Sequence, residues 1–287
     1  MKYFGYILLG AAAFLCSCSN DEPKHAPGHV RLASIVAADN SMLTFSYDKQ
    51  GRITRYDGVS DGLREKALYS YPSSDRIVVD YSATDTGNSS RTVTYHEEFS
   101  ITSGKALSSE GTYEMSTGDE DDILMKSFRR DYAYNDFSQL IGVKHTEIYG
   151  SGDFDDPQSW NQPWSWVNHI DWDNGNIVEF DDFMGSSTPR RISKYSYFAD
   201  KADGNAVVLP SILERYSGPL MRAGVFGAQP ANLLASESVR DKDGELLSNR
   251  RFDYDFADGL VKSYYETGYS PNSASSSKFF EVNWTSY

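Results

Sequence analysis

The chain has 287 residues, enough for one large β domain or two smaller ones. Aromatic residues make up 14% of it, including 20 Tyr, which is typical of strands with half-buried aromatic faces. Acidic residues outnumber basic ones by 41 to 27, and this net charge of −14 argues against a nucleic-acid partner because it repels phosphate backbones.

The N-terminus predicts an export signal and a lipid anchor. Lys2 precedes an apolar stretch, residues 3–15, that is too short to span a membrane. The following Leu-Cys-Ser-Cys, residues 15–18, resembles the lipobox of bacterial lipoproteins. That resemblance implies cleavage before Cys18 and its acylation, palmitate included, because Leu15 is too bulky to precede an acylated Cys16. We expect a signal peptide at 1–17, an acylated tether at 18–30 and one all-β domain at 31–287.

The tether also suggests where the protein is sent. Asp21 and Glu22, just after Cys18, resemble the surface-export signal of Bacteroidales lipoproteins, although an ordinary solvated tether would look the same. Cys16 and Cys18 are the only cysteines, so the mature domain has no disulfide, no cysteine nucleophile and no cysteine-based zinc site. We expect outer-membrane, lipid-anchored localisation with surface exposure.

Residues 45–56 predict a strand, a four-residue turn and a second strand. Aromatic and β-branched residues flank the turn, Asp48 suits its first position, and Gly51 suits the left-handed position that follows. We therefore expect a positive φ at Gly51.

The same pattern recurs to the C-terminus, with Gly, Asn and Asp between β-rich runs. Tyr47, Tyr71 and Tyr95 are evenly spaced, which fits one hairpin with its return turn. One turn is expected at 96–98. The predicted strands are 31–37, 42–47, 53–56, 69–71, 76–81, 91–95, 99–101, 132–134, 139–141, 170–172, 176–180, 195–197, 207–209, 245–247, 252–255, 260–265 and 279–287.

Residues 209–234 interrupt the recurring pattern of hairpins. They contain Pro210, Pro219 and Pro230, and 211–216 predict a short helix. We expect a long excursion across one end of the sheet, and such excursions are often functional. The predicted fold is an all-β, strongly curved antiparallel meander of hairpins, half-barrel or barrel-like, and whether the barrel closes is open.

The motif Tyr47-Asp48-x-x-Gly51-Arg52-Ile53 resembles the YD repeat of Rhs-type proteins. The order of the hairpins resembles a family of uncharacterised Bacteroidales lipoproteins whose domain of unknown function is described as porin-like in fold. The matching segments are 45–56, 170–180 and 252–260, whereas 91–125 departs from the pattern. The resemblance implies a fold and a cellular location, and it identifies no catalytic residues.

Candidate catalytic and metal sites are weak. His96, beside Glu97 and Glu98, could join His145 or His169 around a metal, but surface or sheet-packing roles are simpler. Acidic runs at 119–122, 153–156 and 241–245 offer calcium-type oxygen ligands, and the last also reads as a polar hairpin turn. We assign no catalytic residue, no metal and no cofactor.

Four of the five tryptophans, Trp160, Trp164, Trp166 and Trp172, crowd one short stretch with interleaved amides and carboxylates. Such a mixture suits sugar rings by stacking and hydrogen bonding. The alternative is that Trp166 and Trp172 fill the concave side of the sheet. All four are candidate ligand-binding residues.

These observations favour a binding or interaction module, with glycans among its ligands, over an enzyme. The expected partners are the membrane, through the lipid anchor, and a polysaccharide or protein ligand. The alternative is a carbohydrate-active enzyme or its accessory. A third class, an integral outer-membrane barrel, fits the aromatic C-terminal Tyr287, but charges at Arg52, Asp253 and Asp255 oppose an apolar lipid-facing band.

Overall fold

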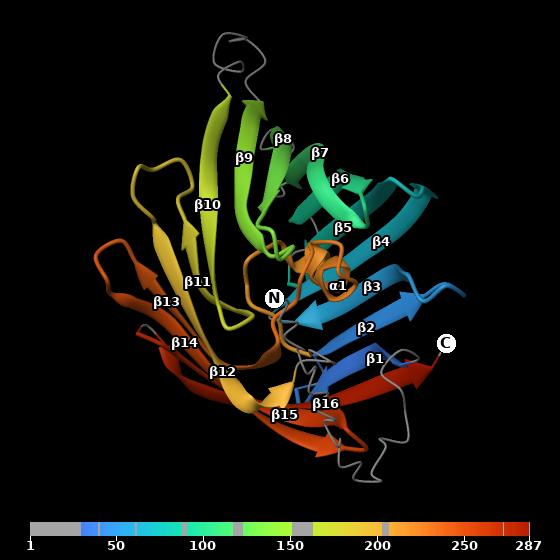
Figure 1. Ribbon diagram of the computed structural model, residues 1–287, viewed down its shortest axis with the longest axis vertical. Coiled ribbons are helices and arrows are strands. Elements are labelled where there is room, and N and C mark those ends of the chain that lie inside the picture. The colour runs from blue at the N-terminus through green and yellow to red at the C-terminus, as the bar shows by residue number, and fades with distance from the viewer. Residues whose placement is uncertain are drawn as a thin grey trace, which may run out of the picture.

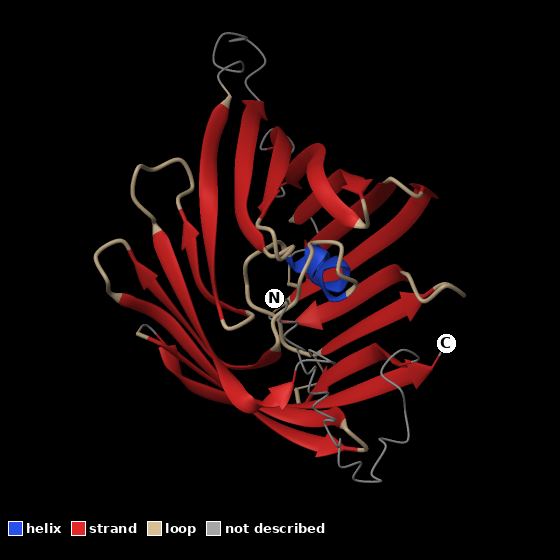
Figure 2. Ribbon diagram, in the orientation of Figure 1, coloured by secondary structure: helices blue, strands red, loops and turns tan. Residues whose placement is uncertain are grey.

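The computed structural model describes residues 30–39, 41–60, 62–87, 91–116, 123–150, 163–202, 207–271 and 273–286. They form a closed antiparallel barrel in which each strand pairs with the next and β1 pairs with β16 (Figure 1 and Figure 2). This confirms the predicted all-β meander, and closure answers the question that the sequence left open.

The strands alternate with turns along the whole chain. Their bounds are β1 Val30–Ala37, β2 Met42–Tyr47, β3 Ile53–Ser60, β4 Leu63–Ser73, β5 Arg76–Asp85, β6 Thr92–Thr102, β7 Lys105–Ser116, β8 Ile123–Tyr134, β9 Leu140–Gly150, β10 Trp164–Asp173, β11 Asn176–Asp182, β12 Arg191–Ala202, β13 Asn232–Asp241, β14 Leu246–Ala257, β15 Leu260–Ser270 and β16 Ser273–Ser286. A 3-10 turn, η2 Arg215–Ser217, and a short helix, α1 Gly218–Arg222, lie between β12 and β13.

The two ends of the barrel differ. Turns such as β2–β3 and β14–β15 lie at one end, called here the short-turn end, together with Val30 and Ser286. The opposite end carries the β1–β2, β9–β10 and β11–β12 connections and is called the long-loop end. In the β2–β3 turn the Asp48 carboxylate accepts hydrogen bonds from the backbone of Gln50 and Arg52, and Gly51 has a φ of 75°. The expected positive φ is confirmed.

One predicted turn is wrong. Residues 96–98 lie within β6, which continues to Thr102, and the chain turns instead at Ser103–Gly104. The strand alternation explains this, because His96 and Glu98 face outward while Glu97 faces inward and is fully buried. A buried carboxylate inside a strand resembles a turn residue when only composition is considered.

Six aromatic side chains repeat one structural device. Each lies near the end of an even-numbered strand and donates a hydrogen bond to a carbonyl of the preceding strand, beside a register shift where a bulge interrupts the ladder. The pairs are Tyr47 with Leu32 (2.8 Å), Tyr71 with Ile53 (2.9 Å), Tyr134 with Ala106 (2.8 Å), Trp172 with Leu140 (2.8 Å), Tyr254 with Leu234 (2.9 Å) and Trp284 with Val261 (2.8 Å).

Tyr47 and Tyr71, two of the three evenly spaced tyrosines, both make this hydrogen bond. The third, Tyr95, has a different role. Tyr95 lies in the middle of β6 and packs against Tyr81 and Tyr216. Because β5 and β6 are longer, the end of β6 lies near Ile101 and not near Tyr95. There the backbone N–H of Ile101 donates a hydrogen bond to the carbonyl of Asp75 (2.7 Å).

The proline-rich excursion lies inside the barrel, not across one end of the sheet as expected. Residues 207–231, called here the plug, occupy the lumen (Figure 1). Tyr216 and Phe226 of the plug are buried against aromatic rings of the wall, with centroid distances of 5.0 Å to Tyr81 and 5.2 Å to Tyr132. The prolines do keep this segment out of the strand ladder. A barrel this wide leaves a lumen that wall side chains alone do not fill, so apolar plug residues gain burial there. The predicted strand 207–209 is likewise part of the plug, and the helix begins later than predicted.

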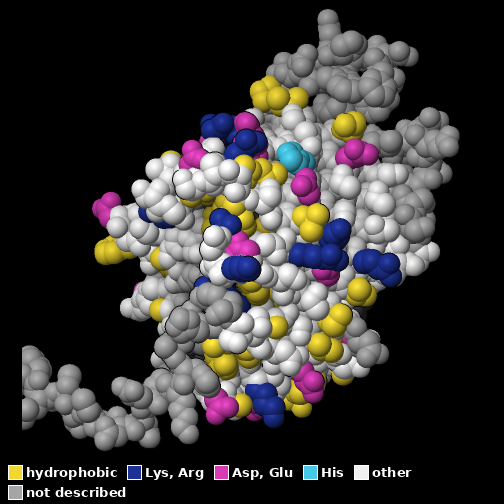
Figure 3. Space-filling model, turned by 90° about the vertical axis from the view of Figure 1, so that its right-hand side faces the viewer, with side chains coloured by type: hydrophobic (Ala, Val, Ile, Leu, Met, Phe, Trp, Pro, Cys, Tyr) yellow, Lys and Arg dark blue, Asp and Glu magenta, His cyan; other side chains and the backbone are white. Residues whose placement is uncertain are grey.

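The outer wall is polar. Ion pairs on it join Arg129 to Asp131, Lys194 to Glu179 and Arg76 to Glu98, and His96 is hydrogen-bonded to Asp80 (2.7 Å). On the face seen in Figure 3, charged side chains of both signs surround isolated hydrophobic ones. A lipid-facing barrel wall carries a continuous apolar band about 25 Å tall, whereas the outer face here carries exposed ion pairs on β3, β8 and β12.

No helix within the described residues is long and apolar enough to cross a membrane.

Candidate functional site

The plug divides the lumen into two cavities. The larger, called here the vestibule, has a volume of about 600 Å³ and extends toward the long-loop end, where Ser41 and Ser276 line it. The plug residues 207–215 form its floor. Its walls carry both signs of charge and several aromatic rings. The charged and aromatic residues are Glu65, Glu214, Glu266, Arg215, Arg222, Arg250, Lys278, Phe45, Tyr56, Tyr264 and Phe280.

Glu65 is a buried acceptor at one side of the vestibule. Its carboxylate receives hydrogen bonds from Tyr56 (2.8 Å) and Tyr81 (2.7 Å), and Arg215 of the plug lies 3.4 Å away. Burial, together with the charge of Glu65, raises the pKa of both tyrosines far above the usual value, so both hydroxyls remain protonated donors. The exposed Arg215 guanidinium is thereby held at the vestibule surface.

Arg250 occupies the opposite side. It donates to the buried Glu237 through Nε (2.8 Å), and its Nη2 donates to Ser211 of the plug (3.0 Å). Glu266 lies 3.8 Å from the same guanidinium. Tyr264 and Phe280 stack beside it with ring centroids 4.5 Å apart. The vestibule therefore offers carboxylates, guanidinium donors and aromatic surface within one cavity.

A buried ion pair between two wall strands, β6 and β8, provides the point at which the plug is attached. Arg130, with a side chain only 7% exposed, donates to Glu97 (2.7 Å), whose side chain is fully buried. Tyr216 of the plug and Ser109 donate to the same carboxylate at 2.7 and 2.5 Å. Because the carboxylate has three donors, its desolvation is compensated and the plug is locked in one position.

The tryptophans predicted to bind ligand have separate roles. Trp172 caps a carbonyl at the short-turn end, so its indole N–H is already used. Trp166 stacks on His145, with ring centroids 4.8 Å apart. Trp164 is 37% exposed and lies against Gly185 of the β11–β12 connection. Trp160 lies outside the described residues, as does Cys18. Of the described three, Trp164 is the most exposed.

His145 is half-buried against the Trp166 ring. The Asn168 amide oxygen accepts from the backbone of Phe183 (3.1 Å), which directs its NH₂ group toward His145 Nε2 at 3.3 Å. Burial, reinforced by the nearby charges of Arg130 and Lys126, lowers the pKa of His145 to about 3.

This histidine makes the barrel sensitive to acid. The unfolded chain gains a proton on His145 below about pH 6.5, whereas the folded chain does so only near pH 3, so stability falls with decreasing pH between these values. We expect wild type to lose about 1.4 kcal/mol per pH unit in this range relative to His145→Phe, which keeps a ring on Trp166. Urea unfolding at pH 7.0, 5.5 and 4.5 measures this, and parallel pH curves for the two proteins would contradict it.

The suggested metal ligands are not brought together. His96 faces outward and contacts Asp80, while Glu97 and His145 face the lumen from different strands. In the 241–245 run, Asp241 accepts from the backbone N–H groups of Asp243 (2.9 Å) and Glu245 (2.8 Å), as in a polar turn. The runs at 119–122 and 153–156 lie outside the described residues.

The lumen-facing charges were not among the predicted site residues. A signal for two of them exists, because Glu65, in the vestibule, and Glu97, beneath the plug contact, occupy inward positions of strands in which neighbouring inward positions are Ala, Tyr or Phe. A charged residue within an otherwise apolar alternation marks a lumen-facing charge. Which strands face one another across the lumen follows only from closure of the barrel.

The closed barrel with an internal plug defines the chain as a plugged β-barrel of porin-like fold. No family model and no curated protein matches it. It is similar to the crystal structure of a porin-like protein from Bacteroides uniformis, at 13% identity and a TM-score of 0.56, over 88% of this chain and 96% of the other. It is also similar to a porin-like protein from Bacteroides vulgatus, at 14% identity and a TM-score of 0.52, over 88% and 97%. The porin-like fold implied by the sequence resemblance is thus confirmed.

Proposed function

We propose that this protein is a lipid-anchored binding module of the outer-membrane surface, that Cys18 carries the lipid, and that the vestibule takes a glycan ligand. The observation that carries the proposal is the vestibule itself, a cavity of about 600 Å³ with a closed floor and mixed charged and aromatic walls. Pockets of this size and composition suit a small ligand with several hydroxyl groups.

Two features favour binding over transport. The plug occupies the lumen, with Leu220 and Tyr216 almost fully buried, which favours a filled barrel over one with the water-filled passage of a channel. The charged outer wall suits water and not lipid, so attachment through acyl chains at Cys18 is the consistent mode of membrane association. β1 begins with Val30 at the short-turn end, whereas the vestibule extends toward the long-loop end, an arrangement that would suit an anchor preceding β1.

The anchor is tested by Cys18→Ala. We expect this variant to leave the membrane fraction after a carbonate wash, because the acyl chains would supply the membrane affinity. Cys16→Ala is the matched control and should remain membrane-bound. A Cys18→Ala protein that stays with membranes would contradict the anchor while leaving the binding proposal open to its own test.

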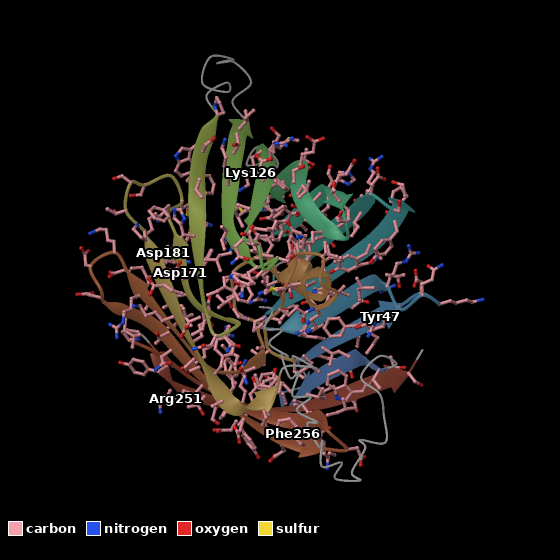
Figure 4. All side chains as sticks on the ribbon, in the orientation of Figure 1. Tyr47, Lys126, Asp171, Asp181, Arg251 and Phe256 are labelled. Atoms are coloured by element: carbon pink, nitrogen blue, oxygen red, sulfur yellow. The ribbon has the colours of Figure 1, made fainter. Side chains whose placement is uncertain are left out.

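The vestibule is tested on a glycan array with the purified protein. We expect Glu266→Gln and Lys278→Gln to weaken binding of any captured glycan roughly tenfold, the effect of about one charge-assisted hydrogen bond. Arg251→Gln, on the outer wall (Figure 4), is the control and should bind like wild type. Equal binding by all four proteins would contradict the vestibule as the site. Release of reducing sugar in the same assay would favour the alternative, a carbohydrate-active enzyme.

Trp164 is a second candidate position for the ligand, since it has an exposed indole face at the long-loop end. Under this proposal Trp160→Ala/Trp164→Ala keeps its melting temperature and loses about 1–3 kcal/mol of binding free energy. Trp172→Ala is the contrast, because loss of a carbonyl cap should lower stability without a specific effect on ligand. A double variant that loses stability but no ligand would remove Trp164 from the site.

A further inference from the structure

The second cavity lies on the other side of the plug, at the short-turn end, and we call it the lower pocket. It has a volume of about 400 Å³. Residues of β1 to β4 and of β16 line it, together with plug residues between 219 and 229. Gln50 in the β2–β3 turn and Ala223 after α1 are exposed lining residues, so the pocket opens between this turn and the plug. It takes no part in the binding role proposed above, although Arg222, Phe45 and Pro219 border both cavities.

Aromatic side chains give the pocket most of its apolar surface. Phe45, Tyr47, Tyr71 and Trp284 line it, and the last three are half-buried members of the carbonyl-capping set. Their polar atoms already donate hydrogen bonds of 2.8, 2.9 and 2.8 Å to backbone carbonyls. These bonds fix the orientation of the rings, so the side chains offer a ligand mainly ring surface. The aliphatic residues that extend this surface are Leu32, Ile53 and Val225.

The charges of the pocket are already engaged within the protein. Three arginines line it, and their partners are Asp48 for Arg52 (2.7 Å), the Gly51 carbonyl for Arg31 (3.4 Å) and the Val207 carbonyl for Arg222. The Arg52 guanidinium also lies 4.3 Å from the Tyr71 ring centroid, in a cation–π contact. Three guanidinium groups oppose a cationic ligand, and their existing partners would compete with an anionic one. The pocket therefore suits a ligand without charge.

The geometry points to the lower pocket as a binding site for a small, uncharged molecule built on an aromatic ring. Such a ring can lie against Tyr47, Tyr71 and Trp284 in the offset or edge-to-face arrangements that aromatic pairs prefer. Its apolar surface leaves water on binding, which is the main driving force for association. Because hydrogen bonds hold the three wall rings before the ligand arrives, these rings lose little freedom when it binds. The volume lies in the range of small-molecule sites, roughly 300–1,000 Å³.

The test is calorimetric titration of the purified protein with indole. Indole-3-acetate and tryptamine are its anionic and cationic counterparts, and butanamide is an uncharged compound without a ring. We expect saturable binding of indole, roughly tenfold or more tighter than that of either charged compound, and no binding of butanamide. Indole binding should not weaken at higher salt, since no charge pairs with the ligand, and it should show a negative change in heat capacity, the mark of buried apolar surface. Equal or tighter binding of indole-3-acetate or tryptamine would overturn the assignment, as would the absence of indole binding.

Two substitutions that fill the pocket locate the site. Gln50→Trp from the wall and Ala223→Trp from the plug would each add a ring at its opening, and we expect either to weaken indole binding roughly tenfold or more. The matched controls are Lys49→Trp, in the same turn as Gln50, and Ala133→Trp, at an exposed position of β8, and neither residue lines the pocket. Both controls should bind indole like wild type. Gln50 is an exposed turn residue, so its variant decides the result if the plug variant fails to fold. Wild-type affinity in both filled variants would overturn the assignment, as would an equal loss in the two controls.

Discussion

Replacing Arg130 with methionine is expected to destabilise the barrel by about 3–5 kcal/mol, because it leaves the fully buried Glu97 without its counter-charge. Urea unfolding at pH 7 measures the loss. Arg129→Met is the matched control one residue away. Arg129 lies on the exposed wall, pairs with Asp131, and should cost less than about 1 kcal/mol.

The double variant Arg130→Met/Glu97→Gln separates the pair from its surroundings. Glutamine keeps an acceptor for Tyr216 and Ser109 while removing the stranded charge. We expect it to recover part of the stability lost in Arg130→Met, because the two residues form one network and their effects do not add. If the effects of Arg130→Met and Glu97→Gln were additive, the two residues would not be energetically coupled.

Tyr216→Ala is expected to cost about 3–5 kcal/mol, the usual range for removing a buried aromatic side chain. Tyr216 lies in the lumen between Tyr81 and Tyr95, with ring centroids 5.0 and 5.2 Å away, so truncation leaves a cavity where the plug meets the wall. Tyr216→Phe keeps the ring and removes the hydroxyl, which donates to Glu97 and accepts from Arg130 (3.3 Å), and should cost about 1.5–3 kcal/mol.

Phe137→Ala is the control for this series. Phe137 is 80% exposed in the β8–β9 turn, and its removal should change stability by no more than about 0.5 kcal/mol. A Tyr216→Ala variant as stable as Phe137→Ala would show that the plug contributes little to folding. Such a result would also favour a plug that leaves the lumen.

The sequence allowed the local elements to be predicted where short-range chemistry decides them. Asp48 and Gly51 specify their turn because a side-chain acceptor and a positive φ are properties of the turn residues themselves. Residues 96–98 were mistaken for a turn because a buried Glu97 is stabilised by Arg130 from β8, a partner that strand pattern alone does not identify. The recurring aromatics predicted hairpins, although their capping of carbonyls in the preceding strand was not foreseen.

By itself the sequence determined the all-β meander, most of its turns and an irregular, proline-rich segment, predicted at 209–234, since alternation, turn residues and proline act over a few positions. The tertiary structure decided that β1 meets β16, that the proline-rich segment enters the lumen and that charges from distant strands share two cavities. These features depend on contacts such as Arg130 with Tyr216, or Arg31 with the β2–β3 turn. Burial rewards such contacts only after the barrel has closed, so no local pattern encodes them.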